Sequence, residues 1–600
     1  MRSISIGGAS GYWGDAVHAT RQLLDAGNID YLVYDYLAEI TMSILARARS
    51  ADDNRGYALD FVGAILRPNL HQIADQGVKV IANAGGVNPI ACGNAIEALI
   101  GELELELKVA VVVGDDVMAH VDGLSTQGIT EIFSGESFPD VERVASANAY
   151  LGAFPIASAL SKGADIVVTG RCVDSAVTLG ACIHEFNWQS NDYDLLAAGT
   201  LAGHILECGT QATGGNYTDW EDVVDSLDNA GYPIATIQAD GSIHISKSEN
   251  TSGLVSVGTV AEQMLYEIGN PQCYTVPDVN CDFSEVVITQ EDTDLVSISG
   301  AKGHGAPDTY KVSLTWQDGF RAGQSWTMYG RDADIKGHKF ASTVYERTNS
   351  ALARMNMPPL SETLVENIGS ETHYGAARTL DSVREVDTKI AAKHPEKRGI
   401  EVFIKEMSAL ALTAPPGLTG FAGARAKASP VVRLFSFLIP KNQLTIECIV
   451  DKKSYTVDET LSDNGSIPEP HSVPATSDTG EMIEVPLESI AWGRSGDKGN
   501  KANVGIIARV PEFLPYIAAS LTADRVQDYF SHYLTTESVE CFYLPGISGL
   551  NFLLHNVLGG GGVASLRNDP QGKGYAQLLL AESISIPKSL ASHQALKKLS

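Results

Sequence analysis

The chain has 600 residues, too many for one hydrophobic core, so we expect two or three domains. Its formal net charge of −30 disfavours a nucleic-acid partner, which needs a concentrated positive surface. The sequence has no uncharged apolar run of about 18 residues, so we expect no membrane-spanning helix. The N-terminus does not resemble a signal peptide. The eight cysteines include no Cys-x-x-Cys pair, which indicates reduced thiols in a cytoplasmic protein.

The first 210 residues alternate predicted strands with predicted helices. Short apolar runs predict buried strands at residues 4–6, 31–34, 78–82, 109–113 and 166–169. Helical periodicity between these runs predicts helices, including segments 37–49, 90–106 and 145–161. This alternation is typical of an α/β fold with a mostly parallel sheet covered by helices, and such sheets bind ligands at the carboxyl ends of their strands.

The first predicted strand leads into the loop GGASGYWGD, residues 7–15. A nicotinamide dinucleotide would favour G-x-G-x-x-G, but Ala9 stands at the second glycine position, although Asp35 lies where a ribose-binding acid is expected. No tyrosine is followed by a lysine four positions later, so the usual catalytic pair of short-chain dehydrogenases is missing. We therefore predict a tight first turn of the domain, with a secondary role in contacting an anion through Gly8 and Gly11.

The pattern changes from about residue 270. Runs such as SEVVITQ, DLVSISG and TYKVSLTW predict an α+β extension over 270–450, within an N-terminal domain that spans 1–450. Residues 451–485 are polar and rich in proline, serine and threonine, which is typical of an interdomain linker. Residues 486–600 predict a small C-terminal α+β domain.

Five stretches are unusual in combination, namely GGASGYWGD (7–15), NAGGVNP (83–89), GADIVVTGRCVD (163–174), AAGTLAGHILECGTQATGGNYTDW (197–220) and RSGDKGNKANVG (494–505). Together they resemble the acyclic terpene utilisation protein AtuA family over nearly the whole chain. The resemblance implies a ferredoxin-like C-terminal domain and a role in the bacterial breakdown of citronellol- and geraniol-type branched acids as CoA thioesters. It implies no established reaction, so the chemistry has to come from the residues.

Two segments follow predicted strands at the ligand-binding edge of the sheet. In TGRCVD, Arg171 is suited to bind a carboxylate or phosphate through two parallel hydrogen bonds, whereas Asp174 either takes part in catalysis or caps the next helix. In NAGGVNP, Asn83, Gly85 and Gly86 predict contacts to substrate, with the start of a helix as the alternative.

His204, Glu207 and Cys208 lie at i, i+3 and i+4, so they share one face of a predicted helix. The His–Glu pair is suited to acid–base chemistry or to a divalent metal, although a third ligand is missing. Cys208 is either a nucleophile or a small core residue.

Two more segments offer groups for catalysis. The turn formed by Gly214, Gly215 and Asn216 predicts a backbone nest for an oxyanion, with a helix C-terminus as the alternative. Asp115 and Asp116 follow another predicted strand, where paired acids would bind Mg²⁺, provide a base, or form a solvated turn.

The C-terminal stretch RSGDKGNKANVG brings Arg494, Ser495 and Lys498 into a glycine-rich loop between predicted strands. We interpret this loop as a phosphate or carboxylate clamp, with a loop that docks the two domains as the alternative. Arg567 and Lys573, in a later glycine-rich segment, are expected to line the same groove.

These patterns predict an enzyme that acts on a branched acyl-CoA by hydration, dehydration or a related carbon–oxygen lyase reaction. Glu207 would be the base and His204 the acid, Arg171 and the turn at 214–216 would stabilise an enolate, and the basic C-terminal loop would hold CoA phosphates. The alternatives are a non-catalytic acyl-CoA binding or assembly subunit, and a hydrolase that uses Cys208 or a metal. We expect a homo-oligomer without nucleic-acid or membrane partners, and no cofactor beyond the CoA of the substrate, with a divalent metal left open.

Overall fold

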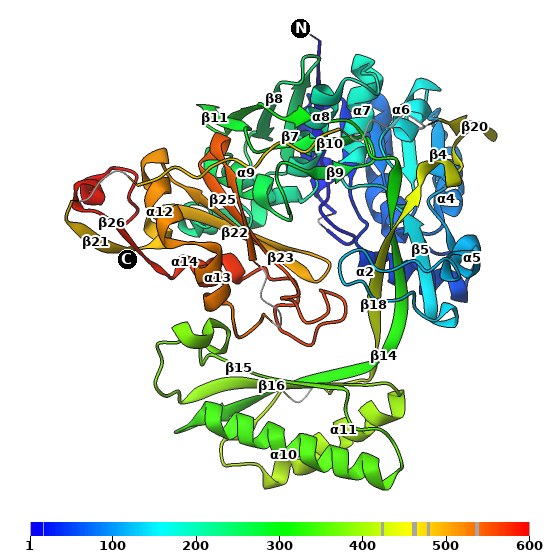
Figure 1. Ribbon diagram of the computed structural model, residues 1–600. Helices are drawn as coiled ribbons and strands as arrows, with labels where there is room; N and C mark the ends of the chain where they lie inside the picture. The colour runs from blue at the N-terminus through cyan, green and yellow to red at the C-terminus, as the bar shows by residue number, and fades with distance from the viewer. Residues whose placement is uncertain are drawn as a thin grey trace.

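The computed structural model of the chain describes residues 2–15, 17–421, 425–458, 465–476, 480–534 and 539–598. They form a large α/β body, a lobe that extends from it on long strands, and a C-terminal domain that packs beside the body (Figure 1). None of the helices in these ranges is long and apolar enough to cross a lipid bilayer.

An 11-stranded sheet forms the centre of the body, in the order β11-β12-β8-β7-β1-β2-β3-β6-β4-β19-β20. Its five middle strands are mutually parallel, as the sequence predicts: β1 (Ser3–Gly8), β2 (Tyr31–Tyr34), β3 (Lys79–Ala82), β6 (Ile166–Thr169) and β4 (Val109–Val113). Antiparallel strands extend both edges: β7 (Pro233–Gln238), β8 (Ile243–Lys247), β12 (Leu295–Ser299) and β11 (Val287–Asp292) on one side, and β19 (Ile446–Val450) and β20 (Lys453–Val457) on the other.

Side chains alternate between two hydrophobic cores, one on each face of this sheet. In β2, Tyr31 and Val33 contribute to one core, whereas Leu32 and Tyr34 contribute to the other. Because both faces are buried, the strands read as continuous apolar runs in the sequence. The helices of the body are α1 (Ala19–Ala26), α2 (Glu39–Ala51), α3 (Arg67–Gln76), α4 (Pro89–Glu102), α5 (Val121–Ser125), α6 (Phe154–Ser161), α7 (Ala176–Phe186), α8 (Tyr193–Leu206) and α9 (Val257–Leu265).

The prediction of one helix over 145–161 is wrong. The segment forms β5 (Val144–Ala149) and then α6, which has Pro155 in its first turn. The alanines of β5 favour a helix locally, but they pair antiparallel with a long strand that is more than 160 residues away in the sequence. Tertiary pairing overrides local propensity here.

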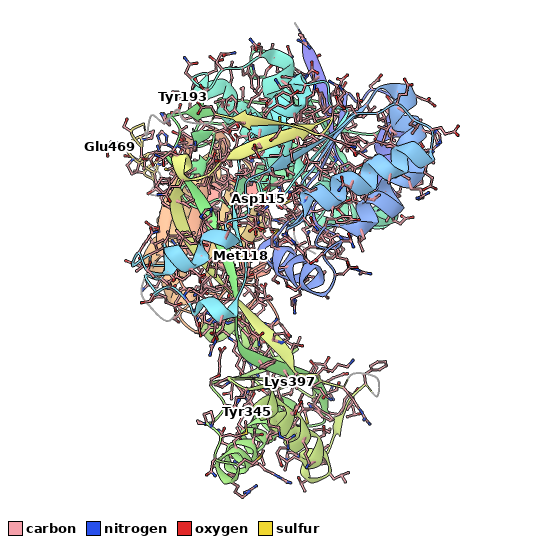
Figure 2. All side chains as sticks on the ribbon, turned by 90° about the vertical axis from the view of Figure 1, so that its right-hand side faces the viewer. Asp115, Met118, Tyr193, Tyr345, Lys397 and Glu469 are labelled. Atoms are coloured by element: carbon pink, nitrogen blue, oxygen red, sulfur yellow. The ribbon has the colours of Figure 1, made fainter. Side chains whose placement is uncertain are left out.

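That long strand, β14 (Thr309–Tyr329), runs out of the body into the lobe. It pairs with β18 (Ser429–Pro440), and the lobe adds β15 (Glu362–Ile368), β16 (Glu385–His394), β17 (Leu418–Thr419), α10 (Ala333–Arg354) and α11 (Lys397–Ala409). Figure 2 shows Tyr345 and Lys397 on the lobe, well apart from Asp115 and Met118 on the body. Beside α8, a small sheet contains β9 (Tyr274–Val276), β10 (Val279–Asp282) and β13 (Lys302–Gly303).

The C-terminal domain has an antiparallel four-stranded sheet in the order β22-β23-β25-β24. Its elements are β22 (Ala491–Lys498), β23 (Lys501–Ala508), β24 (Val539–Leu544), β25 (Gly549–Leu554), α12 (Leu514–Ser520), α13 (Ala523–Tyr529) and α14 (Tyr575–Leu580), with β21 (Met482–Pro486) paired to β26 (Ser583–Pro587). The expected glycine loop at 494–505 is instead the β22–β23 hairpin, because its residues pair across the two strands. Within the expected linker 451–485, β20 and the start of β21 are strands.

Candidate functional site

A cavity of about 760 Å³ lies at the carboxyl ends of β1, β2 and β6, where the C-terminal domain meets the body. Gly11, Asp35 and Arg171 follow these three strands, and Glu207 follows α8. The opposite parts of the wall come from β9, β14 and the β22–β23 hairpin. This volume is typical of small-molecule sites, and the position is the one that ligands take in open α/β sheets.

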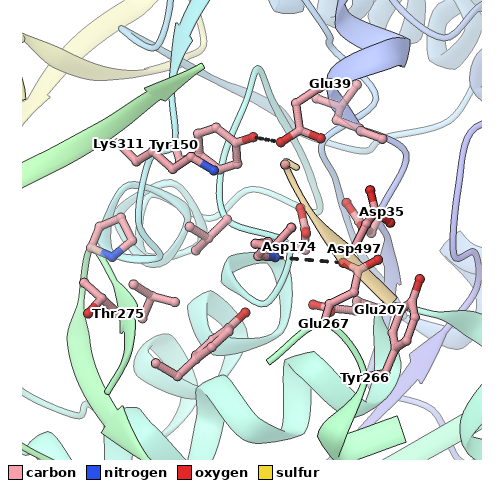
Figure 3. A pocket seen from close by; sticks show the side chains of 18 of the residues that line it. Asp35, Glu39, Tyr150, Asp174, Glu207, Tyr266, Glu267, Thr275, Lys311 and Asp497 are labelled. Atoms are coloured by element: carbon pink, nitrogen blue, oxygen red, sulfur yellow. Dashed lines mark hydrogen bonds and ion pairs between the residues drawn. The ribbon is translucent and has the colours of Figure 1, made fainter. Parts of the chain in front are cut away.

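Charged groups dominate part of this wall. Figure 3 shows Asp35, Glu207, Glu267 and Asp497 gathered on one side of the cavity, away from Thr275. Its described lining includes six carboxylates and four cations: Asp35, Glu39, Asp174, Glu207, Glu267 and Asp497, with Arg171, Lys311, Lys498 and Lys573. Burial raises the pKa values of four of these carboxylates, so they do not all carry a full negative charge together: Asp35, Glu207, Glu267 and Asp497.

Glu207 is held in place by His204. Oε1 of Glu207 lies 2.9 Å from Nδ1 of His204, while Nε2 of His204 donates to the carbonyl of Met264 at 3.1 Å. A carbonyl can only accept, so the other imidazole nitrogen and Glu207 share one proton. The side chain of Glu207 is only 8% exposed, and its other oxygen, Oε2, is buried without a hydrogen-bond partner. Glu207 is therefore a cavity-lining carboxylate whose second oxygen is buried without a hydrogen bond.

The electrostatics of the pair fit a shared proton. Burial opposes the charge of His204, but the Glu207 carboxylate outweighs burial and raises the pKa of the imidazole. Burial raises the pKa of Glu207 as well, against the opposing effect of His204. The ring of His204 is itself sealed, at 1% exposure, and does not line the cavity. His204 therefore supports Glu207 from behind instead of facing a substrate as expected.

Glu267, which the sequence patterns do not indicate, is a second carboxylate in this group. Lys498 and Lys573 approach its two oxygens at 3.9 and 3.7 Å. Burial raises the pKa of Glu267 to about 7, against the opposing charge of Lys498. The residue has φ +60°, a left-handed conformation that is uncommon for a residue with a side chain. Such backbone strain is enriched at functional sites.

Arg171 belongs to a second charged group. Its Nη1 donates to Asp174 at 2.8 Å, its guanidinium carbon lies 4.1 Å from the centre of the Tyr150 ring, and its Nε has no hydrogen-bond partner. Lys311 lies 4.9 Å from the same ring, and the Tyr150 hydroxyl donates to Glu39 at 2.6 Å (Figure 3). Burial opposes the charge of Glu39, but Lys311 and Arg171 lower its pKa to about 2.

A buried carboxylate, Asp115, holds the loop that carries Arg171 in place through hydrogen bonds. Asp115 accepts from the backbone N–H of Arg171 and from Nδ2 of Asn148, both at 2.8 Å. Burial raises the pKa of Asp115 to about 6. The Asp116 carboxylate accepts a hydrogen bond from the backbone N–H of Met118 at 2.9 Å. Both acids therefore have structural partners here.

The predicted C-terminal clamp residues lie in different places. Lys498 lines the cavity, where burial opposes its charge but Tyr274 and the nearby carboxylates raise its pKa well above the usual value. Arg494 is buried, donates to the carbonyl of Asn216 at 2.9 Å and to the amide oxygen of Gln211, and does not line the cavity. Ser495 is buried against the 572–576 segment. Arg494 therefore contacts the body, as expected of a loop that docks the two domains, whereas Ser495 packs within the C-terminal domain.

The other predicted binding segments support the wall from outside. The amide of Asn83 donates to the Asp35 carboxylate and accepts from the N–H of Tyr36. Glycine is needed at four predicted positions of these segments because a Cβ would lie within 3.0 Å of neighbouring atoms: Gly8, Gly11, Gly85 and Gly86. Among the predicted glycines of these segments, Gly11 lines the cavity, and Tyr12 beside it does so as well.

The turn at Gly214, Gly215 and Asn216 does not line the cavity either. A Cβ on Gly214 would meet Val223 at 2.8 Å, and one on Gly215 would meet the Thr210 carbonyl at 2.9 Å. The turn is packed, so the oxyanion nest expected there is not directed at the cavity.

Cys208 lines the cavity, and burial together with the charges of Glu207 and Glu267 raises the pKa of its thiol well above the usual value. A thiol that holds its proton is a poor nucleophile. All eight cysteines are free. Across the described ranges, no three His, Cys, Asp or Glu side chains are arranged to hold a metal ion.

Fold and site together define a two-domain α/β protein with a carboxylate-rich cavity at the carboxyl edge of its main sheet. Residues 4–450 match the model of the acyclic terpene utilisation family protein AtuA, and residues 485–585 match that of the AtuA ferredoxin-like domain. The chain therefore belongs to the AtuA family, which confirms the resemblance and points to the utilisation of acyclic terpenes. Neither a curated protein nor a solved structure gives a significant match to the chain.

Proposed function

We propose that the protein is an enzyme of branched acyl-CoA catabolism that adds water to, or removes water from, the α,β position of an unsaturated or hydroxy acyl-CoA thioester. Family membership supports the pathway. The observation that carries the reaction class is Glu207, a carboxylate that lines the cavity and has one oxygen fixed by His204. A carboxylate held in this way is suited to take or return the proton at Cα.

Two cations that line the cavity, Arg171 and Lys498, are suited to stabilise the negative charge that forms when the Cα proton is removed. When Glu207 takes the Cα proton, negative charge moves to the thioester oxygen. Arg171, with its unpaired Nε, and Lys498 both line the cavity and supply positive charge for that oxygen. In the hydration direction Glu207 returns the proton to Cα.

The lining suits an acyl chain better than a nucleotide. We place the acyl chain and the thioester inside the cavity and the nucleotide outside it. Apolar side chains from separate elements provide surface for a branched hydrocarbon: Leu37, Val173, Val276, Leu438 and Ile467.

The test is incubation with a panel of branched unsaturated and hydroxy acyl-CoAs, followed by mass spectrometry. We expect a mass change of one water, and Glu207→Gln should lower turnover by about 10²- to 10⁴-fold while leaving ligand affinity nearly unchanged. Glu97→Gln, on the exposed surface of α4, is the matched control and should behave like the parent. Binding without any turnover across the panel would contradict the proposal and favour a binding subunit.

A further inference from the structure

The C-terminal domain binds the loop that carries Glu267 through side-chain hydrogen bonds. Asn503, on β23 and 3% exposed, accepts from the Glu267 N–H at 2.9 Å and donates to the Leu265 carbonyl at 2.7 Å. Its Nδ2 also donates to Asn551 at 3.0 Å, which in turn donates to the carbonyls of Ile268 and Gly269 at 2.8 and 2.6 Å. Two buried asparagines therefore fix the backbone on both sides of Glu267.

The same domain leaves little room for this loop to move. A Cβ on Gly496 would lie 2.4 Å from the Tyr266 ring and 2.9 Å from Cγ of Glu267, so β22 packs directly on both side chains. The left-handed backbone of Glu267 persists only where its surroundings enforce it. The Asn503 hydrogen bond to its N–H is such a constraint.

We infer that Glu267 is the acid that acts together with the base Glu207. Asn503, on the C-terminal domain, is the positioning residue that holds the Glu267 loop in place. This inference rests on the proposed function. In dehydration, Glu207 takes the Cα proton and the C–H electron pair becomes the C=C bond. The C–O bond breaks with its electron pair on oxygen, and Glu267 protonates that oxygen, so that water leaves. Hydration reverses these transfers.

The surroundings of Glu267 support a protonated acid. Charged and titratable groups face it from α2, α8, the β6 loop, β22 and the 558–575 segment: Glu39, Glu207, Cys208, Asp174, Arg494, Asp497, Lys498 and Lys573. Its pKa of about 7 results mainly from burial and from the neighbouring carboxylates, which oppose a further negative charge. Two carboxylic groups with different environments are the usual basis of an acid–base pair.

The first experiment separates the two proton transfers in the full-length protein. With a branched 3-hydroxyacyl-CoA in ²H₂O, Glu267→Gln should lower water elimination by about 10²- to 10⁴-fold yet keep Cα hydrogen exchange, which depends on Glu207. Asn503→Ala should lower elimination by up to about 10²-fold and shift the alkaline limb of the pH profile, whereas Asn54→Ala, in an exposed turn, should change neither. Elimination at the parental rate in Glu267→Gln, or an unshifted profile in Asn503→Ala, would overturn the inference.

A second measurement needs no substrate, so it tells failure of this inference from failure of the proposed function. Infrared difference titration of the parent against Glu267→Gln reads the carboxylic acid of Glu267, which we expect to titrate at about pH 7. Asn503→Ala should move that midpoint. If Asn503→Ala does not fold, the Glu267→Gln comparison still decides whether this carboxyl is protonated at neutral pH. A midpoint near the ordinary value for glutamate would overturn the acid assignment.

Discussion

Asp219 joins the body to the C-terminal domain, and its removal should loosen the interface that closes the cavity. Its two oxygens accept from Nη1 and Nη2 of Arg509 at 2.6 and 2.7 Å, from Lys597 at 2.8 Å and from the indole N–H of Trp492 at 2.7 Å. The side chains of Asp219 and Arg509 are each 8% exposed. Asp219→Ala would leave the buried Arg509 without a carboxylate partner, with hydrogen bonds only to the Glu488 carbonyl remaining.

The expected magnitude follows from that burial. Removing one partner of a buried ion pair costs about 3–5 kcal/mol. Because Lys597 is closer to solvent and can rehydrate, we take about 3 kcal/mol, or about two orders of magnitude in the equilibrium for opening the interface. Glu221→Ala is the matched control, since it removes the exposed second partner of Lys597 at 3.0 Å. Exposed ion pairs contribute little, so the control should open like the parent.

Amide hydrogen exchange measures this opening directly. Peptides that cover residues 216–222 and 491–498 should exchange about 10²-fold faster in Asp219→Ala. Burial opposes the charge of Asp219, but Arg509 and Lys597 lower its pKa, so its stabilisation is complete above the ordinary aspartate pKa and is lost as pH falls through the lowered value. The difference between parent and variant should therefore be constant at neutral pH and shrink in acid. Equal exchange in Asp219→Ala and Glu221→Ala would show that Asp219 does not hold the interface closed.

Three further outcomes are expected. Cys208→Ala should retain turnover, because burial keeps the thiol protonated, and complete loss in a kinetic assay would instead favour the hydrolase hypothesis. Dialysis against EDTA should leave turnover unchanged, since no three potential ligands cluster in the part of the chain that the structure describes, and a tightly held stoichiometric ion in elemental analysis would contradict this. Acyl-pantetheine, which lacks the nucleotide, should be turned over with a kcat/KM within about tenfold of that of the acyl-CoA if the nucleotide lies outside, because few contacts are then lost, and a far larger loss would place the nucleotide in a built site.

The centre of the fold was predictable because of how it is buried. Strands β1, β2, β3, β4 and β6 are covered on both faces, so each appears in the sequence as a short apolar run between helical segments. The failure at β5 has the opposite cause. Its alanines carry no strand signal of their own, and only their pairing with β14 makes them a strand.

Within the candidate site, position along the chain was easier to predict than orientation. Arg171 and Asp174 follow a strand at the ligand-binding edge, and both line the cavity. The i, i+3 spacing showed that His204 and Glu207 share a helix face, but not that Glu207 alone reaches the cavity. The spacing of two residues on one helix does not show which of them is covered when other elements pack against that helix.

Other wall residues had no local signal at all. Glu267 lies in an irregular loop after α9, and its environment comes from β22 and β23, more than 220 residues later in the chain. Tyr150 and Lys311 come together only because β5 pairs with β14. Such groups are recognisable from tertiary structure, not from spacing in the sequence.

In the proposed reaction, Glu207 moves the Cα proton of an acyl thioester bound in this cavity. Mass spectrometry of a branched 3-hydroxyacyl-CoA recovered from ²H₂O measures this transfer. The parent protein should introduce deuterium at Cα, and Glu207→Gln should not do so above the non-enzymatic rate. Deuterium uptake at the same rate in both proteins, or water elimination that persists in Glu207→Gln, would contradict the account.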